Sequence, residues 1–248
     1  MKKKIKDLYE GFEKIQRIGW IRSLNSNNSG GVGLTFEKIL GISNNELEIP
    51  DYNGIEIKTK RSNSNSYITL FSCKPEGKYY HEVERIKDQY GYPHKRLKQY
   101  NVLNNSVYGN KKNKIGIKFY FKLKVEHECR KIFLLIYDLK GNLLEQEVYW
   151  DFDLLEEKIK RKLSVLAFIK ADSKLIEGIE YFKYISLELY FIKNFKTFLD
   201  LVEKGIVRLN FKLGIKTKGD KIGKIYDHGT GFEILERDIT KLYNKIII

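Results

Sequence analysis

Cysteine and histidine are scarce in this sequence of 248 residues. The two cysteines, Cys73 and Cys129, lie far apart and form no Cys-x-x-Cys pair, and there are four histidines. These numbers exclude a disulfide framework and do not support a zinc finger. We therefore expect a protein of a reducing compartment, the cytoplasm.

Long hydrophobic runs are also missing. No segment approaches the ~20 consecutive apolar residues that a membrane-spanning helix needs. The first lysines resemble the start of a signal peptide, but Asp7, Glu10 and Glu13 interrupt any apolar segment behind them. Proline is rare, with 3 residues, and 42% of the residues are hydrophobic, so extended disorder is not expected. The sequence predicts one large domain, or two lobes that share a core, with no membrane partner.

Acidic residues are in deficit. The chain has 46 Lys and Arg against 32 Asp and Glu, a formal net charge of +14. Such an excess is typical of proteins with a polyanionic partner, and nucleic acid is the first candidate. Residues 89–125 include no Asp or Glu and alternate lysines with tyrosines, which suits contact with a phosphate backbone. The alternative is a solvated lysine-rich surface without a partner.

The hydrophobic pattern predicts a helix, then short strands, then mixed α/β structure. Apolar residues recur every three or four positions from 5 to 18, which predicts an amphipathic helix. A second short helix is expected over 34–42, after a glycine-rich loop at 25–33. Extended runs at 46–60 and 66–73 predict a small mixed sheet. Further strands are expected at 131–139, 147–153, 165–174 and 206–219, helices at 154–163 and 195–205, and core positions for Trp20 and Trp150.

The stretch IPDYNGIEIKTKR, residues 49–61, contains the strongest local signal in the chain. Its Asn-Gly pair favours a two-residue type I′ hairpin turn, because both central residues of that turn need positive φ. Asp51 would then lie opposite Glu56, with both side chains on one face, and Lys58 would share that face. The isoleucines between them would point into the core.

Two opposed carboxylates repel each other unless a cation lies between them. Mg²⁺ suits such oxygen ligands, and Lys58 would then orient an attacking water or stabilise charge on a phosphate. The alternative is an ordinary surface cluster that Lys58 neutralises.

Asp51, Glu56 and Lys58 match the PD-(D/E)xK nuclease pattern, and the wider sequence resembles the MvaI/BcnI restriction endonucleases, which are related to the nicking enzyme MutH. The resemblance spans most of the chain. It is carried by these blocks in order: GGVGLTFEKIL at 30–40, IPDYNGIEIKTKR at 49–61, ITLFS at 68–72, VYWDFD at 148–153, ADSK at 171–174, YFKY at 181–184 and DHGTGF at 227–232.

The resemblance implies a mixed α/β fold of the PD-(D/E)xK type, with two lobes flanking a DNA-binding cleft. The expected catalytic lobe is 1–125 and the expected recognition lobe is 126–248. It further implies a monomeric type II restriction endonuclease that hydrolyses double-stranded DNA at a short CC-N-GG-like site with Mg²⁺, held by Asp51 and Glu56. Glu37 matches a further catalytic glutamate of the family. A cognate DNA methyltransferase encoded nearby is a functional partner that this role requires.

Several residues outside the catalytic set are candidates for DNA contact. Arg208 has the chemistry of a guanine reader but would equally fit the outer face of its strand, and His228 would read a base edge or serve as a structural hydrogen-bonding residue. The full set is Lys60, Arg61, Arg208, Lys216, Lys218, Lys221, Lys224, Asp227, His228 and Thr230. Two alternatives to a double-strand endonuclease stay open: a MutH-like nickase with the same catalytic residues, and a non-catalytic nucleic-acid-binding protein.

Overall fold

The computed structural model describes residues 1–25, 30–42, 50–79 and 81–246. Parts of the predicted glycine-rich loop and of the extended run at 46–60 lie outside the described residues. The described chain divides into two compact units, of which the first comprises Met1–Ser66, Lys158–Lys193 and Tyr243–Ile248 and the second Tyr67–Glu157 and Asn194–Leu242. This interleaved division differs from the expected boundary between residues 125 and 126. Its physical reason is that strands distant in sequence pair with one another in each unit.

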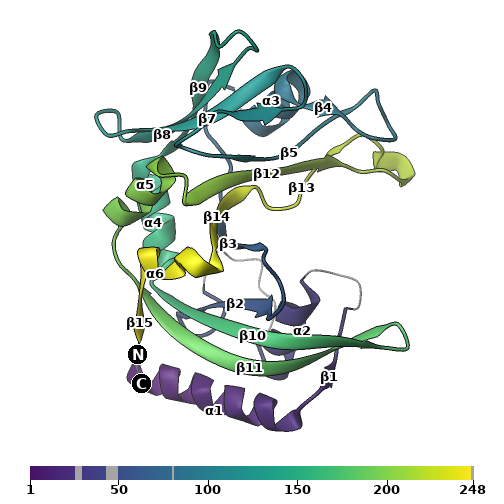
Figure 1. The fold of residues 1–248 in the computed structure, drawn as a ribbon, viewed down its shortest axis with the longest axis vertical. Helices are drawn as coiled ribbons and strands as arrows, with labels where there is room; N and C mark the ends of the chain where they lie inside the picture. The colour runs from purple at the N-terminus through teal and green to yellow at the C-terminus, as the bar shows by residue number, and fades with distance from the viewer. Residues whose placement is uncertain (26–29, 43–49, 80, 247–248) are drawn as a thin grey trace. The chain divides into compact units, whose positions relative to one another are not determined.

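The first unit is a sheet with helices packed on it (Figure 1). The sheet has the strand order β1-β11-β10-β2, and β15 pairs with β11. β2 runs parallel to β10, with Glu56 opposite Leu166 and Lys58 opposite Phe168, whereas β11 is antiparallel to its partners. Its elements are α1 (Lys2–Ile18), β1 (Ile21–Arg22), α2 (Gly31–Ile39), β2 (Glu56–Arg61), β10 (Val165–Ile176), β11 (Ile179–Ile192) and β15 (Tyr243–Ile246).

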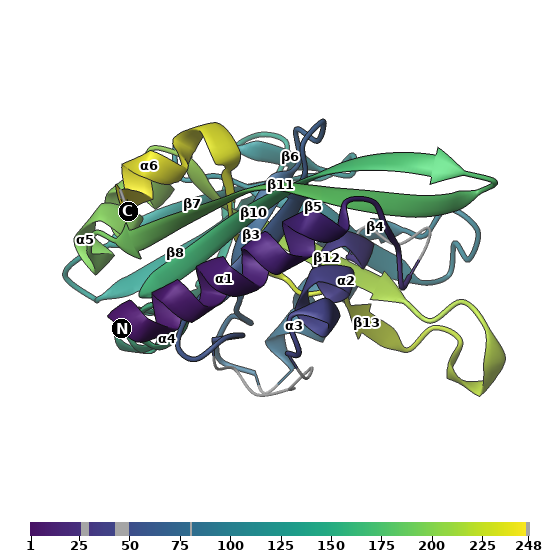
Figure 2. The same cartoon turned by 90° about the horizontal axis from the view of Figure 1, so that it is seen from below.

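Helix α1 follows the sheet along β11, as Figure 2 shows from below. Its apolar stripe of Leu8, Phe12 and Ile15 is buried, as the spacing predicts, in a core shared with α2, the hairpin and the central strands. Tyr184 and Phe36 pack at a ring distance of 5.1 Å in this core. The core therefore fixes α2 against the strand that carries Glu56 and Lys58.

The second unit has two sheets, ordered β3-β14-β12-β5-β4 and β6-β7-β8-β9, and β13 pairs with β12. Strand β12 alternates strictly between buried and partly exposed residues, so one face carries the core and the other carries polar side chains. The elements are β3 (Tyr67–Ser72), α3 (Glu82–Tyr90), β4 (Tyr92–Pro93), β5 (Asn101–Val107), β6 (Asn113–Ile115), β7 (Phe119–Glu126), β8 (Lys131–Tyr137), β9 (Leu143–Asp151), α5 (Phe195–Glu203), β12 (Val207–Ile215), β13 (Ile225–Asp227), β14 (Gly231–Leu235), α6 (Ile239–Leu242) and the 3₁₀ turns Gly219–Lys221 and Glu236–Asp238. Helix α4 (Phe152–Leu163) belongs to both units.

Aromatic side chains fill the core of the second unit. Trp150 is 1% exposed and packs on Phe232 at 5.9 Å, which confirms its predicted role in the core. Trp20, in the first unit, does not follow the prediction: it is 38% exposed, with the Lys174 ammonium 4.1 Å from the centre of its ring. The flexible lysine side chain covers part of the indole, so Trp20 is partly shielded from water without being buried in the core.

Most predicted elements are present, but the expected small mixed sheet is wrong. The two extended runs belong to different sheets, because β2 pairs with β10 and β3 pairs with β14. The long strand β11 and the final strand β15 were not predicted from the sequence. In the described residues, no helix is both long and apolar enough to cross a membrane.

Candidate active site

The Asn-Gly turn before β2 forms as the sequence predicts. Tyr52 and Ile55 exchange backbone hydrogen bonds of 3.0 and 2.8 Å across it, and Asn53 and Gly54 adopt φ of 50° and 92°. Ile55 and Ile57 are buried in the core, in agreement with their predicted direction. The turn therefore fixes the register of the segment that carries the candidate catalytic residues.

Glu56 lies deep in the first unit. Its side chain is 1% exposed, and its Oε1 atom accepts a hydrogen bond from the Lys58 ammonium at 2.5 Å. The other oxygen, Oε2, is buried and has no hydrogen-bond partner among the residues that the structure describes. Burial raises the pKa of Glu56 above its ordinary value, Lys58 opposes this shift, and Asp51 adds to it. The carboxylate is thus only partly neutralised by the protein.

Asp51 and Glu37 complete the cluster. Asp51 is held in place by its Oδ2 atom, which accepts the backbone N–H of Ile57 at 2.9 Å. Burial raises the pKa of Glu37, and the neighbouring Asp51 raises it further while Lys58 lowers it. Glu37, Asp51, Glu56 and Lys58 therefore lie near enough to one another to interact electrostatically, in agreement with the sequence-based prediction.

Glycine at position 33 leaves room for this arrangement. A Cβ atom there would lie 3.0 Å from Thr59 Oγ1 and 3.5 Å from Glu37 Oε1. Helix α2 begins at Gly31, inside the loop expected at 25–33, so the helix starts earlier than the predicted residue 34. A larger residue at 33 would press on both strand β2 and the Glu37 carboxylate.

The carboxylates fit a divalent cation. A buried carboxylate oxygen without a hydrogen-bond partner is costly, and within the described residues Glu56 Oε2 is such an atom. Carboxylate oxygens are also the hard ligands that Mg²⁺ prefers. In the part of the chain that the structure describes, no three His, Cys, Asp or Glu side chains form a ready-made metal cluster. A cation at Glu56 and Asp51 would therefore take its remaining ligands from water and substrate.

A second lysine at this site was missed by the sequence analysis. Lys162, on α4, places its ammonium 3.7 Å from Glu56 Oε1. The sequence gave no signal for this contact, because Lys162 lies among other basic residues in the last turn of an amphipathic helix. The contact depends on the parallel pairing of β2 with β10, the strand that follows the helix.

Two candidates for DNA contact lie at the end of β2. Lys60 is 6% exposed and hence buried. Arg61 forms a two-point ion pair with Glu180, at 2.6 and 2.7 Å, and its guanidinium lies 5.2 Å from the centre of the Phe182 ring. Burial of Lys60 and the ion pair of Arg61 are contacts within the first unit, and they form without DNA.

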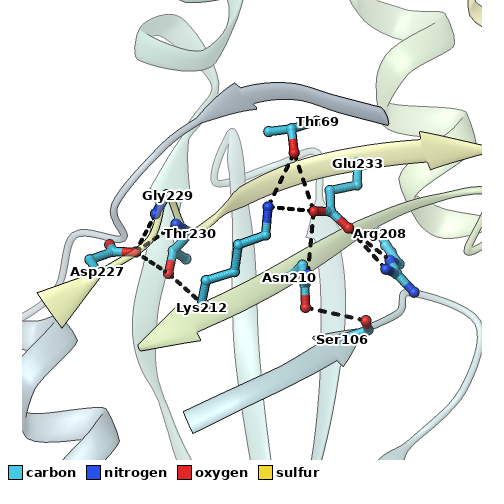
Figure 3. Close-up of polar contacts among 9 residues, drawn as sticks. All are labelled: Thr69, Ser106, Arg208, Asn210, Lys212, Asp227, Gly229, Thr230 and Glu233. Atoms are coloured by element: carbon cyan, nitrogen blue, oxygen red, sulfur yellow. Dashed lines mark hydrogen bonds and ion pairs between the residues drawn. The ribbon is translucent and has the colours of Figure 1, made fainter. Parts of the chain in front are cut away.

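The second unit carries a polar sheet face centred on Glu233, which we call the β12 polar face (Figure 3). Lys212 lies 2.7 Å from Glu233 Oε1, and Arg208 lies 2.9 Å from Oε2. Arg208 also contacts the Tyr108 hydroxyl at 3.2 Å. Burial alone would raise the pKa of Glu233, but Lys212 and Arg208 outweigh it and hold the pKa below its ordinary value. The residues of this face are Thr69, Ser106, Arg208, Asn210, Lys212 and Glu233.

Arg208 therefore lies on the partly exposed face of its strand, and its guanidinium is already engaged. Asn210 and Lys212 follow it on the same face, so a row of hydrogen-bonding groups runs along β12. Asn210 and Lys212 were not among the residues predicted from the sequence. The signal available in the sequence was the alternation of polar with apolar residues along this strand, which puts Asn210 and Lys212 on the same face as Arg208.

The loop after β12 presents the predicted lysines to solvent. Asp227 Oδ1 accepts hydrogen bonds from Gly229 N and Thr230 N, at 2.9 and 2.7 Å, so Asp227 and the buried Thr230 shape the loop. His228 is exposed, and its ring packs edge-on to Tyr226 at 4.3 Å. An open pocket of about 550 Å³ beside it includes His94, Asn210, Lys212 and His228 in its lining. The exposed lysines are Lys216, Lys218, Lys221 and Lys224.

Comparisons with known proteins agree with the resemblance predicted from the sequence. A model of the MvaI/BcnI restriction endonuclease family matches residues 9–243. Restriction endonuclease MvaI in complex with its cognate DNA substrate is similar at 28% identity over 96% of each chain, with a TM-score of 0.89. MvaI without DNA is similar at 28% identity over 100% of this chain and 98% of that one, with a TM-score of 0.64. None of the curated proteins compared with the chain matches it. The mixed α+β fold expected from the sequence is confirmed.

Proposed function

The chain belongs to the MvaI/BcnI restriction endonuclease family, and on that premise we propose that it hydrolyses both strands of duplex DNA at a short specific sequence. The supporting observation is the cluster around Glu56. Its buried carboxylate has one oxygen on a lysine, and the other has no hydrogen-bond partner in the described part of the chain. The proposed catalytic residues are Glu37, Asp51, Glu56 and Lys58.

Asp51 and Glu56 would hold the divalent cation that enzymes of this family generally use, and we infer that it is Mg²⁺. When bound, the ion supplies positive charge for the scissile phosphate and lowers the pKa of a water molecule. Glu37, whose pKa responds to Asp51, would hold water molecules at the edge of the site. The hairpin keeps Asp51 and Glu56 in register by the hydrogen bond from Ile57.

Lys58 is the proposed positioning group for the attacking water. Its side chain is 26% exposed, so it is partly open to solvent while its ammonium contacts Glu56. When phosphate and water enter, the ammonium can donate hydrogen bonds to either, because lysine carries three donors. The bond that forms joins a water oxygen to phosphorus, and the bond that breaks releases a sugar oxygen.

The second unit would read the DNA sequence. The β12 polar face offers amide, ammonium and guanidinium groups of the kind that pair with base edges. The exposed lysines at 216–224 would contact phosphates and set the position of the duplex. We infer a target of the CC-N-GG-like class, action as a monomer in the cytoplasm, and a DNA methyltransferase that protects host DNA.

A MutH-like nickase would use the same catalytic residues and is distinguished by its product. The test is to incubate supercoiled unmethylated plasmid with the protein and either Mg²⁺ or EDTA, and to sequence the product ends. The proposal predicts Mg²⁺-dependent linear fragments with a shared end sequence. Relaxed circles alone would indicate a nickase. Intact DNA that is bound in both conditions would indicate a non-catalytic binding protein.

A further inference from the structure

Glu56 is shared by two lysines, and the proposed mechanism uses one of them. Lys58 Nζ and Lys162 Nζ both approach the same oxygen, Oε1, at 2.5 and 3.7 Å. Lys162 comes from α4, whereas Lys58 comes from the strand that carries Glu56 itself. The Lys162 side chain is 23% exposed, so its ammonium is partly withdrawn from water. Holding a lysine there needs a charge partner, and Glu56 provides it.

The two lysines differ in what they can do when substrate arrives. Each donor that Lys58 directs to phosphate or water is one fewer for Glu56. Lys162 comes from a separate helix and lies 3.7 Å from Oε1, so that oxygen keeps a second positive neighbour. No lysine of the described segments binds Oε2, which leaves this oxygen available to a divalent cation.

The net charge of the site depends on Lys162. When all three are ionised, the carboxylates of Glu37, Asp51 and Glu56 carry three negative charges against the two positive charges of Lys58 and Lys162, which leaves one net negative charge. A divalent cation changes the net charge to one positive charge, which favours an anionic phosphate. Without Lys162, the same site would attract the cation more strongly and would be neutral once it is loaded.

We propose that Lys162 is a positioning residue that holds Glu56 Oε1 and sets the charge of the active site, weakening cation binding while favouring the phosphate. This inference rests on the proposed nuclease function. It predicts opposite changes in two quantities when the charge at position 162 is removed. A residue needed only for folding would change both in the same direction.

The experiment compares Lys162→Met and Lys162→Arg with the wild type. Mg²⁺ binding is measured by calorimetry without DNA, and the single-turnover cleavage rate is measured at saturating Mg²⁺. Lys162→Met should bind Mg²⁺ about tenfold more tightly, by loss of charge repulsion, and should cleave at least about tenfold more slowly by loss of phosphate attraction. Lys162→Arg keeps the charge and should stay within about threefold of the wild type in both.

Lys183→Met serves as the matched control, because Lys183 is exposed on β11 in the same unit. It should behave as the wild type in both measurements. If Lys162→Met does not fold, as judged by circular dichroism, Lys162→Gln takes its place with the same expected result. Unchanged or weaker Mg²⁺ binding, or cleavage at the wild-type rate, overturns the proposal. A wild type that neither binds Mg²⁺ nor cleaves DNA would instead overturn the proposed function.

Discussion

The carboxylate of Asp51 reaches across its hairpin and accepts the backbone N–H of Ile57 at 2.9 Å. This bond joins the residue before the turn to the strand after it. The position of Asp51 relative to Glu56 therefore depends on the turn between them, and in particular on Gly54, whose φ of 92° is unfavourable for any residue with a side chain.

Replacing this glycine should reduce both stability and cleavage. Gly54→Ala meets no atom within 4 Å, so its cost of about 1–2 kcal/mol is confined to the backbone. Thermal melts and cleavage rates measure the two effects. Gly178→Ala is the control, because Gly178 has φ of 76°, equally open surroundings and a place in the β10–β11 turn. Equal cleavage by the two variants would contradict the account.

Removing the Asp51 charge should abolish the response to Mg²⁺. The wild type should gain about 1.4 kcal/mol in unfolding free energy when Mg²⁺ is present at tenfold its dissociation constant. Asp51→Asn should gain almost nothing and should not cleave DNA. As a control, Asp7→Asn on α1 should keep both the Mg²⁺ response and the cleavage of DNA. A full Mg²⁺ response in Asp51→Asn would show that the cation binds elsewhere.

Glu233 should contribute to stability in a pH-dependent manner. Glu233→Gln leaves Arg208 and Lys212 without a counter-charge and should cost about 3 kcal/mol at neutral pH. The pKa of Glu233 is depressed in the folded state, so its contribution is present above the ordinary glutamate pKa of about 4.3 and is lost as pH falls through the folded value. Urea unfolding at several pH values measures this.

The difference between Glu233→Gln and the wild type should accordingly shrink on acidification. Glu128→Gln, at an exposed position in the same unit, is the control and should change stability little at any pH. A difference that stays constant from neutral to strongly acidic pH would mean that the ion pairs do not lower the pKa.

The loop lysines should determine the salt dependence of DNA binding. Changing all four to glutamine should weaken binding to any duplex and lower the slope of log K against log salt by about 3.6, or ~0.9 for each phosphate that a lysine no longer neutralises. Fluorescence anisotropy at several salt concentrations measures the slope. The variant changes Lys216, Lys218, Lys221 and Lys224; the control changes the exposed Lys140, Lys183, Lys196 and Lys204. The same slope in both variants would show that the loop lysines do not contact DNA phosphates.

Local signals in the sequence predicted local structure well. The Asn-Gly pair gave the hairpin, and apolar spacing gave the buried face of α1, because both depend on neighbouring residues alone. The family motifs placed Glu37 beside Asp51 and Lys58, which periodicity alone could not do. Trp20 was misplaced because a lysine covers its ring, a contact between distant segments.

Long-range pairing was the part that the sequence could not predict. Nothing near Glu56 indicates that β2 pairs with β10, and this parallel pairing buries the Glu56 carboxylate among core strands. The same topology brings Lys162 to Glu56 and divides the chain into interleaved units. The polar groups of β12 form a connected face because they contact Glu233 on β14. The pairing of β12 with β14 is also a product of sheet topology.

The most direct test of the central claim compares the wild type with Lys58→Ala on one duplex that carries the cleavage site. Cleavage is followed with Mg²⁺, and binding is followed by anisotropy with Ca²⁺ in its place. The account predicts that Lys58→Ala loses at least about a thousandfold in cleavage rate, through loss of water and phosphate positioning, and binds within about threefold of the wild type. Cleavage at the wild-type rate would contradict the catalytic role of the Glu56–Lys58 pair.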